Sequence, residues 1–164
     1  MIADGVNSLM KVGLNSDVVI AWRKVYEQSK NQPEEILAQE LYTCDTDTAC
    51  RSVFSYLAKN VQYKLDPYGI QYIKTPARLL QDGEGDCKSL TLFIAACLHC
   101  LGIPCIVRFV NFDGGNQYTH VYPVALDENG NEIILDACEL DKDGKPKYNY
   151  ARPYNRKKDI NYNV

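Results

Sequence analysis

The chain has 164 residues, the length of one ordinary domain with enough residues for a hydrophobic core. Hydrophobic residues make up 46% of it and charged residues 24%, a balance that excludes wholesale disorder. The formal net charge of -3 gives no reason to expect nucleic acid as a partner.

No apolar run approaches the roughly 18 residues that cross a bilayer, and the segment from Met1 to Met10 lacks a basic stretch. We therefore expect no signal peptide, no membrane attachment and a cytoplasmic location. The chain has seven cysteines. In a reducing compartment we expect them to be thiols, and the ordinary role of each is core packing.

Residues 1–44 are predicted to form a helical preface. Asp17 is a suitable cap for a first helix with a regular apolar face. Pro33, followed by two glutamates, predicts a second short helix that ends near Leu41. A third helix is predicted after Asp45, since residues 53–58 carry apolar side chains on one side.

The middle of the chain first alternates and then becomes strongly apolar. Residues 61–65 predict a short strand or an extended segment, and Pro76 predicts one or two helical turns over residues 76–81. Residues 88–101 predict an apolar helix that ends at Gly102.

The residues that follow are typical of strands joined by a tight turn. Residues 105–112 and 118–126 are rich in β-branched and aromatic residues, which favours strands. Residues 127–130 predict a hairpin turn, and residues 132–136 predict the returning strand. The fold class expected is therefore α+β, with an antiparallel sheet packed against the helix that begins near Cys87.

We expect one domain over residues 1–164, with its core at about residues 50–138 and a strap over residues 139–164. The strap is rich in lysine, asparagine and tyrosine. Its basic residues are compatible with an anionic surface as partner, but interspersed aspartates favour a solvated strap across the domain. The strap is also a candidate for one wall of a cleft.

Cys87 is the candidate nucleophile, because it stands at the predicted start of the apolar helix. Partial positive charge at a helix N-terminus favours the thiolate, and free N–H groups there can stabilise an oxyanion. Gly85 lets the backbone approach closely at this point. The alternative for Cys87 is an inert cysteine at a helix start.

The chain has two histidines, and one of them is excluded as a partner of Cys87. His99 lies on the same predicted helix, about 18 Å away at a rise of about 1.5 Å per residue. His120 lies on a strand that can fold back over the helix. By elimination, His120 is the candidate general base.

Asp136 is the candidate third member of the site. If Asp127 pairs with Asn131 across the turn, His120 faces Cys138 and Asp136 is its diagonal neighbour on the same face. A carboxylate there would fix the tautomer of the imidazole. An odd shift in register would put the two residues on opposite faces, and a turn-capping aspartate is the structural alternative.

These residues stand in a series of motifs that resembles the core of transglutaminase-like domains. The similarity covers about residues 50–138, and the motifs are Gly85-Asp86-Cys87, Leu101-Gly102-Ile103-Pro104, Arg108-Phe109-Val110, Thr119-His120-Val121-Tyr122 and Ile134-Leu135-Asp136. The resemblance implies a papain-like fold. Within the family, this chain is similar to the small stand-alone domains of bacterial and phage proteins. It implies Cys87 as nucleophile, His120 as general base and acid, and Asp136 as orienting carboxylate.

The sequence departs from that family in two respects. Its members often have proline or threonine directly after the aspartate, where this chain has Ala137. No side chain is evident for the oxyanion hole either. Gln62, Tyr63 and Gln71 are the candidates, and backbone amides near Cys87 are the alternative.

A second pattern of cysteines invites a metal or redox interpretation. Cys97 and Cys100 flank His99, and Cys105 is close in the sequence. Zinc would require a closed set of four ligands, and Cys44 and Cys50 do not have a usual ligand spacing. We therefore expect no metal site and no cofactor.

Two classes of function remain open from the sequence. The first is a thiol enzyme that acts on amide or peptide bonds of a protein or peptide, by hydrolysis or by transfer to an amine. The second is a binding or assembly module that retains the fold without turnover. The three residues Cys87, His120 and Asp136 favour the enzyme, and hydrolysis is the expected reaction.

Overall fold

In a computed structural model of the protein, residues 9–12, 16–35, 37 and 45–162 are described. The named elements are, in order, β1 (Leu9–Val12), α1 (Ser16–Ser29), α3 (Thr46–Asn60), β2 (Gln62–Tyr63), β3 (Gln71–Lys74), α4 (Pro76–Asp82), β4 (Glu84–Gly85), α5 (Cys87–Cys100), β5 (Cys105–Asn111), β6 (His120–Leu126), β7 (Glu132–Ile134) and β8 (Arg156–Tyr162).

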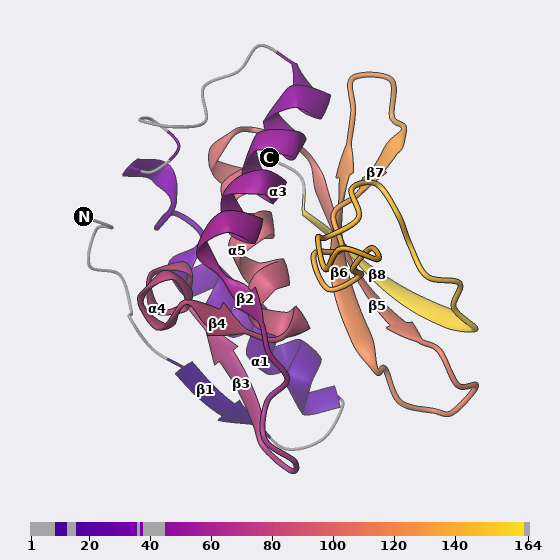
Figure 1. Ribbon diagram of the computed structural model, residues 1–164. Coiled ribbons are helices and arrows are strands. Elements are labelled where there is room, and N and C mark those ends of the chain that lie inside the picture. The colour runs from indigo at the N-terminus through magenta and orange to yellow at the C-terminus, as the bar shows by residue number, and fades with distance from the viewer. Residues whose placement is uncertain (1–8, 13–15, 36, 38–44, 163–164) are drawn as a thin grey trace.

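The helices lie together on one side of a four-stranded antiparallel sheet, with α5 next to the sheet (Figure 1). The strand order is β7-β6-β5-β8. Two small pairs, β1 with β3 and β2 with β4, lie on the helical side and away from the sheet. The predicted α+β class, with an antiparallel sheet against the apolar helix, is thus confirmed.

Helix α5 is the central element because it is apolar on nearly every side. Every residue from Lys88 to Leu98 is buried, so neighbouring layers cover the helix all round. Asp86 caps its start by accepting a hydrogen bond from the amide of Lys88. Thr91 Oγ1 donates to the carbonyl of Val121 at 3.1 Å and so ties α5 to β6.

The predicted helices before α5 are found with small shifts of their ends. The first begins at Ser16, one residue before the expected cap, and the helix expected over residues 76–81 extends to Asp82. Asp45 caps α3 through the amide of Thr48. Of the helix expected from Pro33 to Leu41, residues 34, 35 and 37 are helical, and most of the rest lies outside the described residues.

The expected solvated strap is wrong in one respect, because its last part is a strand of the sheet. Strand β8 pairs with β5 along its whole length, from Cys105 opposite Tyr162 to Asn111 opposite Arg156. The ring of Tyr162 lies 4.5 Å from that of Tyr26 in α1, so the strap also contributes to the core. The alternation of β8 is weak because its first residues, Arg156, Lys157 and Lys158, are charged and exposed on both faces of the strand.

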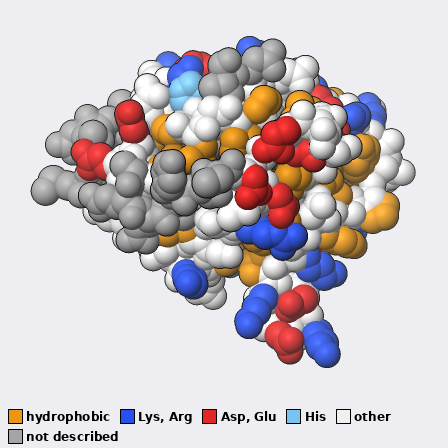
Figure 2. All heavy atoms as spheres, turned by 90° about the horizontal axis from the view of Figure 1, so that it is seen from above, with side chains coloured by type: hydrophobic (Ala, Val, Ile, Leu, Met, Phe, Trp, Pro, Cys, Tyr) orange, Lys and Arg blue, Asp and Glu red, His pale blue; other side chains and the backbone are white. Residues whose placement is uncertain are grey.

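Figure 2 shows one face of the molecule, on which acidic and basic side chains are interspersed with hydrophobic ones. Neither sign of charge forms a broad field on this face. Within the described residues, no helix is both long enough and apolar enough to cross a membrane.

Candidate active site

Cys87 is the first residue of α5, as the sequence predicted. The preceding Gly85 is buried, and a Cβ added there would lie 2.6 Å from Leu79 Cδ1 and 3.2 Å from Ser89 Cβ. The first contact is shorter than real Cβ atoms show, so any side chain here would force the buried Leu79 to move, and glycine is favoured where the chain enters the helix. The close approach expected at Gly85 is confirmed.

His120 is the first residue of β6, and Asp136 lies just after β7. The hairpin has the register expected from its turn, since the amide of Asp127 donates to the carbonyl of Asn131 at 3.0 Å. Consequently His120 and Asp136 share a face, and His120 Nε2 lies 2.7 Å from Asp136 Oδ2. Their side chains are only 9% and 1% exposed, so little water competes for this hydrogen bond.

Cys87 lies beside the imidazole of His120 on the wall of the same clefts and acts on its pKa, so the structure brings all three predicted residues together. Burial alone lowers the pKa of His120, but the interactions with Asp136 and Cys87 outweigh it and raise the pKa to about 10. At neutral pH this ring is therefore an imidazolium. The rings of Phe112 and Tyr122 pack beside it, 5.6 and 5.9 Å away between centroids.

Two clefts meet at Cys87 and His120. One, of about 270 Å³, is walled by Phe109, Tyr118 and other residues of the sheet side. The other, of about 570 Å³, is walled by the 65–70 loop between β2 and β3. Because both clefts share Cys87 and His120, together they give access to the thiol from two directions.

The lining of the two clefts distinguishes between the three side chains that are candidates for the oxyanion hole. Gln71 borders both clefts, Tyr63 borders one of them, and Gln62 borders neither. The amide of Lys88, directly after the nucleophile, is already bonded to Asp86, so it is not free to bind an oxyanion. Among these candidates, Gln71 has the position that best suits an amide donor.

A buried ion cluster beside Cys87 was not predicted from the sequence. Lys88 Nζ is paired with Asp86 and lies 3.4 Å from Asp66 Oδ2. Burial raises the pKa of Asp86 to about 6. For Lys88, burial alone lowers the pKa, but the charges of Cys87 and Asp86 outweigh it and raise the pKa. In the sequence, the lysine directly after the nucleophile is the one sign of this ion cluster. No pattern in the sequence predicts that Asp66 lies close to Lys88.

The cysteines proposed as a possible metal set lie elsewhere. Cys97 and Cys105 are buried, and Cys100 Sγ lies 3.3 Å from the carbonyl of Lys30. Among the described residues, Cys97, His99 and Cys100 do not form a group with metal-ligand geometry. The six cysteines among the described residues form no disulfide, and Cys44 lies outside those residues.

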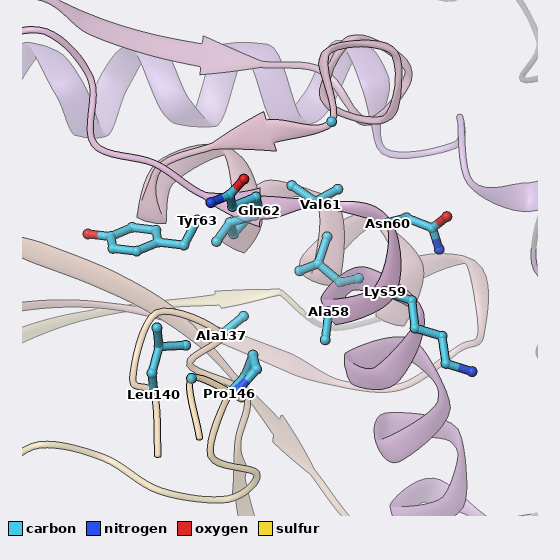
Figure 3. Close-up of a pocket in the computed structure, with 13 residues that line it drawn as sticks. Ala58, Lys59, Asn60, Val61, Gln62, Tyr63, Ala137, Leu140 and Pro146 are labelled. Atoms are coloured by element: carbon cyan, nitrogen blue, oxygen red, sulfur yellow. The ribbon is translucent and has the colours of Figure 1, made fainter. Parts of the chain in front are cut away.

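A further pocket of about 450 Å³ lies between the end of α3 and the strap. In Figure 3, Val61, Gln62 and Tyr63 line one side, and Ala137, Leu140 and Pro146 line the other. The strap therefore forms a wall of this pocket. It does not contribute to the lining of the two clefts at Cys87.

A family model and several solved structures match this chain. The model of the transglutaminase-like superfamily matches residues 22–137. A solved candidate protease from Parabacteroides distasonis aligns with a TM-score of 0.59 and 15% identity over 83% of this chain. A candidate cysteine protease from Cytophaga hutchinsonii aligns with a TM-score of 0.55 and 13% identity over 94% of this chain. LapG from Legionella pneumophila aligns with a TM-score of 0.47 and 22% identity; the alignment covers 90% of this chain and 75% of the LapG chain.

This chain is short relative to the first two of those structures. It covers 26% of the Parabacteroides chain and 62% of the Cytophaga chain. A likeness at such low identity shows a shared fold. A comparison with curated proteins gives no match.

Proposed function

This chain belongs to the transglutaminase-like superfamily, and we propose that it is a thiol-dependent enzyme that hydrolyses amide or peptide bonds. The single observation that carries the proposal is that His120 is hydrogen-bonded to Asp136 and lies beside Cys87. A thiol, an imidazole and a buried carboxylate in that order are the parts of a nucleophile with its base and orienting group.

In the proposed mechanism, Cys87 is the nucleophile, and His120 is the base that already holds the thiol proton in the resting site, as an imidazolium beside the thiolate. Asp136 bonds Nε2 of His120, which leaves Nδ1 as the ring nitrogen for the Cys87 proton. The thiolate attacks the carbonyl carbon, and the resulting oxyanion accepts a hydrogen bond from Gln71. His120 then gives its proton to the leaving amine, and a thioester remains on Cys87.

In the second half of the reaction, water replaces the amine. His120, now neutral, takes a proton from the water as it attacks the thioester carbonyl. The tetrahedral intermediate collapses to a carboxylic acid, and the thiol of Cys87 is released. An amine that enters instead of water would give transamidation by the same residues.

The substrate proposed is an extended peptide or protein segment. The two clefts leave from the same thiol in different directions, as a chain on both sides of a scissile bond requires. One cleft is bordered by Leu65 and Tyr68, two of the most exposed large hydrophobic residues in the described chain. Exposed apolar side chains at a cleft favour contact with apolar groups of a partner.

A mixture of peptides, incubated with the protein and analysed by mass spectrometry, tests this proposal. New termini, formed by wild type and absent with Cys87→Ala, are the expected result. A labelled primary amine in a parallel sample detects transamidation. If neither product forms while Cys87 still reacts selectively with an alkylating agent, the binding module becomes the better account. Cys100→Ser is the matched control, since that thiol lies outside the clefts.

A further inference from the structure

A second sulfur-containing residue, besides Cys87, belongs to the immediate surroundings of His120. The thiol of Cys138, one ring nitrogen of His120 and one carboxylate oxygen of Asp136 all lie within 4.8 Å of one another. A turn just after β7 explains this cluster, because the amide of Cys138 donates to Asp136 Oδ1 at 3.1 Å and so holds Cys138 beside Asp136. The mechanism proposed above uses His120 and Asp136 but gives no role to Cys138.

We propose that Cys138, His120 and Asp136 form a binding site for one Zn²⁺ ion, which occupies a ring nitrogen of His120 and so removes the acid–base function of that ring. A thiolate, an imidazole and a carboxylate are three of the ligands that zinc prefers. Tetrahedral zinc with these ligands needs donor atoms about 3.5 Å apart. The donor atoms of the three residues lie within 4.8 Å of one another, and the shortest printed spacing is 2.7 Å, from His120 Nε2 to Asp136 Oδ2. An ion between them therefore requires the imidazole and the carboxylate to move apart.

The position of the cluster favours a soft cation. His120 and Asp136 are nearly inaccessible, at 9% and 1% exposure, so a bound ion would be shielded from water on the sheet side. His120 also lines both clefts, which gives an ion a path to the ring. A thiolate ligand favours zinc over magnesium or calcium, which prefer oxygen ligands. On binding, the thiol of Cys138 and the imidazolium each release a proton to solvent.

Such a site would act as an inhibitory switch, a consequence that rests on the proposed function. Zinc on the His120 ring prevents that ring from exchanging a proton with Cys87 or a leaving group. The metal site itself depends only on the three ligands. Cys87 is not among them, so Cys87→Ala separates metal binding from catalysis.

The experiment is a titration with Zn²⁺ against a chromophoric chelator, in the presence of a phosphine reductant. We expect wild type and Cys87→Ala to bind one Zn²⁺ per chain, and Cys138→Ser to bind at least about tenfold more weakly. Cys100→Ser is the matched control and should bind like wild type. With Co²⁺, a thiolate-to-cobalt absorption band should appear in wild type and be absent in Cys138→Ser.

The result that would overturn the proposal is equal binding by wild type and Cys138→Ser, or the absence of stoichiometric binding. Loss of binding in Cys87→Ala, with retention in Cys138→Ser, would also overturn it. Circular dichroism and thermal unfolding of each variant show whether the fold is kept. Stoichiometric Zn²⁺ binding without peptide cleavage would support the metal site and contradict the proposed function. The failure of one proposal is therefore distinguishable from the failure of the other.

Discussion

His120 Nε2 lies 2.7 Å from Asp136 Oδ2, although the two residues are 16 positions apart in the sequence. The hairpin between them supplies this closeness, because its register puts both on one face of the sheet. Asp136 thereby orients the imidazole and, with Cys87, raises its pKa. The predictions that follow begin from this pair.

The two histidines should titrate far apart. His120 has a pKa raised to about 10, whereas burial and the nearby Lys30 charge lower the pKa of His99 below its ordinary value of 6.5. NMR of the imidazole C–H signals over a range of pH measures both values. Asp136→Asn should lower the His120 pKa and leave that of His99 unchanged. Similar pKa values near 6.5 for both rings would contradict the geometry.

The raised pKa of His120 has a consequence for stability. The folded protein holds a proton that the unfolded chain, with a pKa of 6.5, releases more readily. This contribution to stability is therefore complete below about pH 6.5 and is lost as the pH rises towards about 10. Urea unfolding should show the advantage of wild type over His120→Gln declining across this window. An advantage that is constant, or that grows with pH, would be inconsistent with a protonated His120.

Much of the site was predictable because it depends on local patterns. The start of the apolar helix is marked by Asp86, a good cap, and by the glycine before it. His120 and Asp136 lie on the same face of the sheet because the turn between their strands is short and the side chains of a strand alternate between its two faces. These features are set by neighbours in the sequence, so a single sequence is enough to predict them.

What could not be predicted depends on pairings between distant segments. Strand β8 lies beside β5, although the segment reads as a charged tail. Asp66 lies near Lys88 because a loop carries it there. Neither pairing has a periodic signal, since the first residues of β8 are charged and exposed on both faces and a loop has no repeat. The selection of Gln71 over Gln62 likewise required the clefts.

Gly85→Ala should destabilise the fold. The added Cβ would lie 2.6 Å from Cδ1 of Leu79, which is fully buried and has little room to move. We expect a loss of about 1–3 kcal/mol in the free energy of unfolding, measured with urea. Gly115→Ala is the matched control, because its new Cβ would lie 3.1 Å from Oδ1 of the exposed Asp113 and otherwise makes only an ordinary contact of 3.8 Å with Asn111 Nδ2. An equal effect of both substitutions would show that the close packing at Gly85 is not needed.

Arg108 should be important for holding β8 in the sheet. Its side chain is 4% exposed and binds Asp159 of β8 at 2.8 Å and Glu132 of β7 at 2.9 Å. Arg108→Met leaves two partly exposed carboxylates, which water can solvate, so we expect a loss of about 2 kcal/mol. Lys64→Met, which removes an exposed pair with Glu84, should change stability by less than about 1 kcal/mol. Thermal unfolding compares the two, and equal losses would argue against a special role for Arg108.

The central claim is that His120 and Asp136 activate the thiol of Cys87. Limiting iodoacetamide near about pH 6, followed by peptide mapping, tests it most directly, since an activated thiolate reacts where ordinary thiols are slow. We predict that Cys87 is alkylated first in the wild-type protein and that His120→Ala abolishes this preference. Equal reaction of all seven cysteines, or earlier reaction of Cys138 and Cys44 than of Cys87, would contradict the claim.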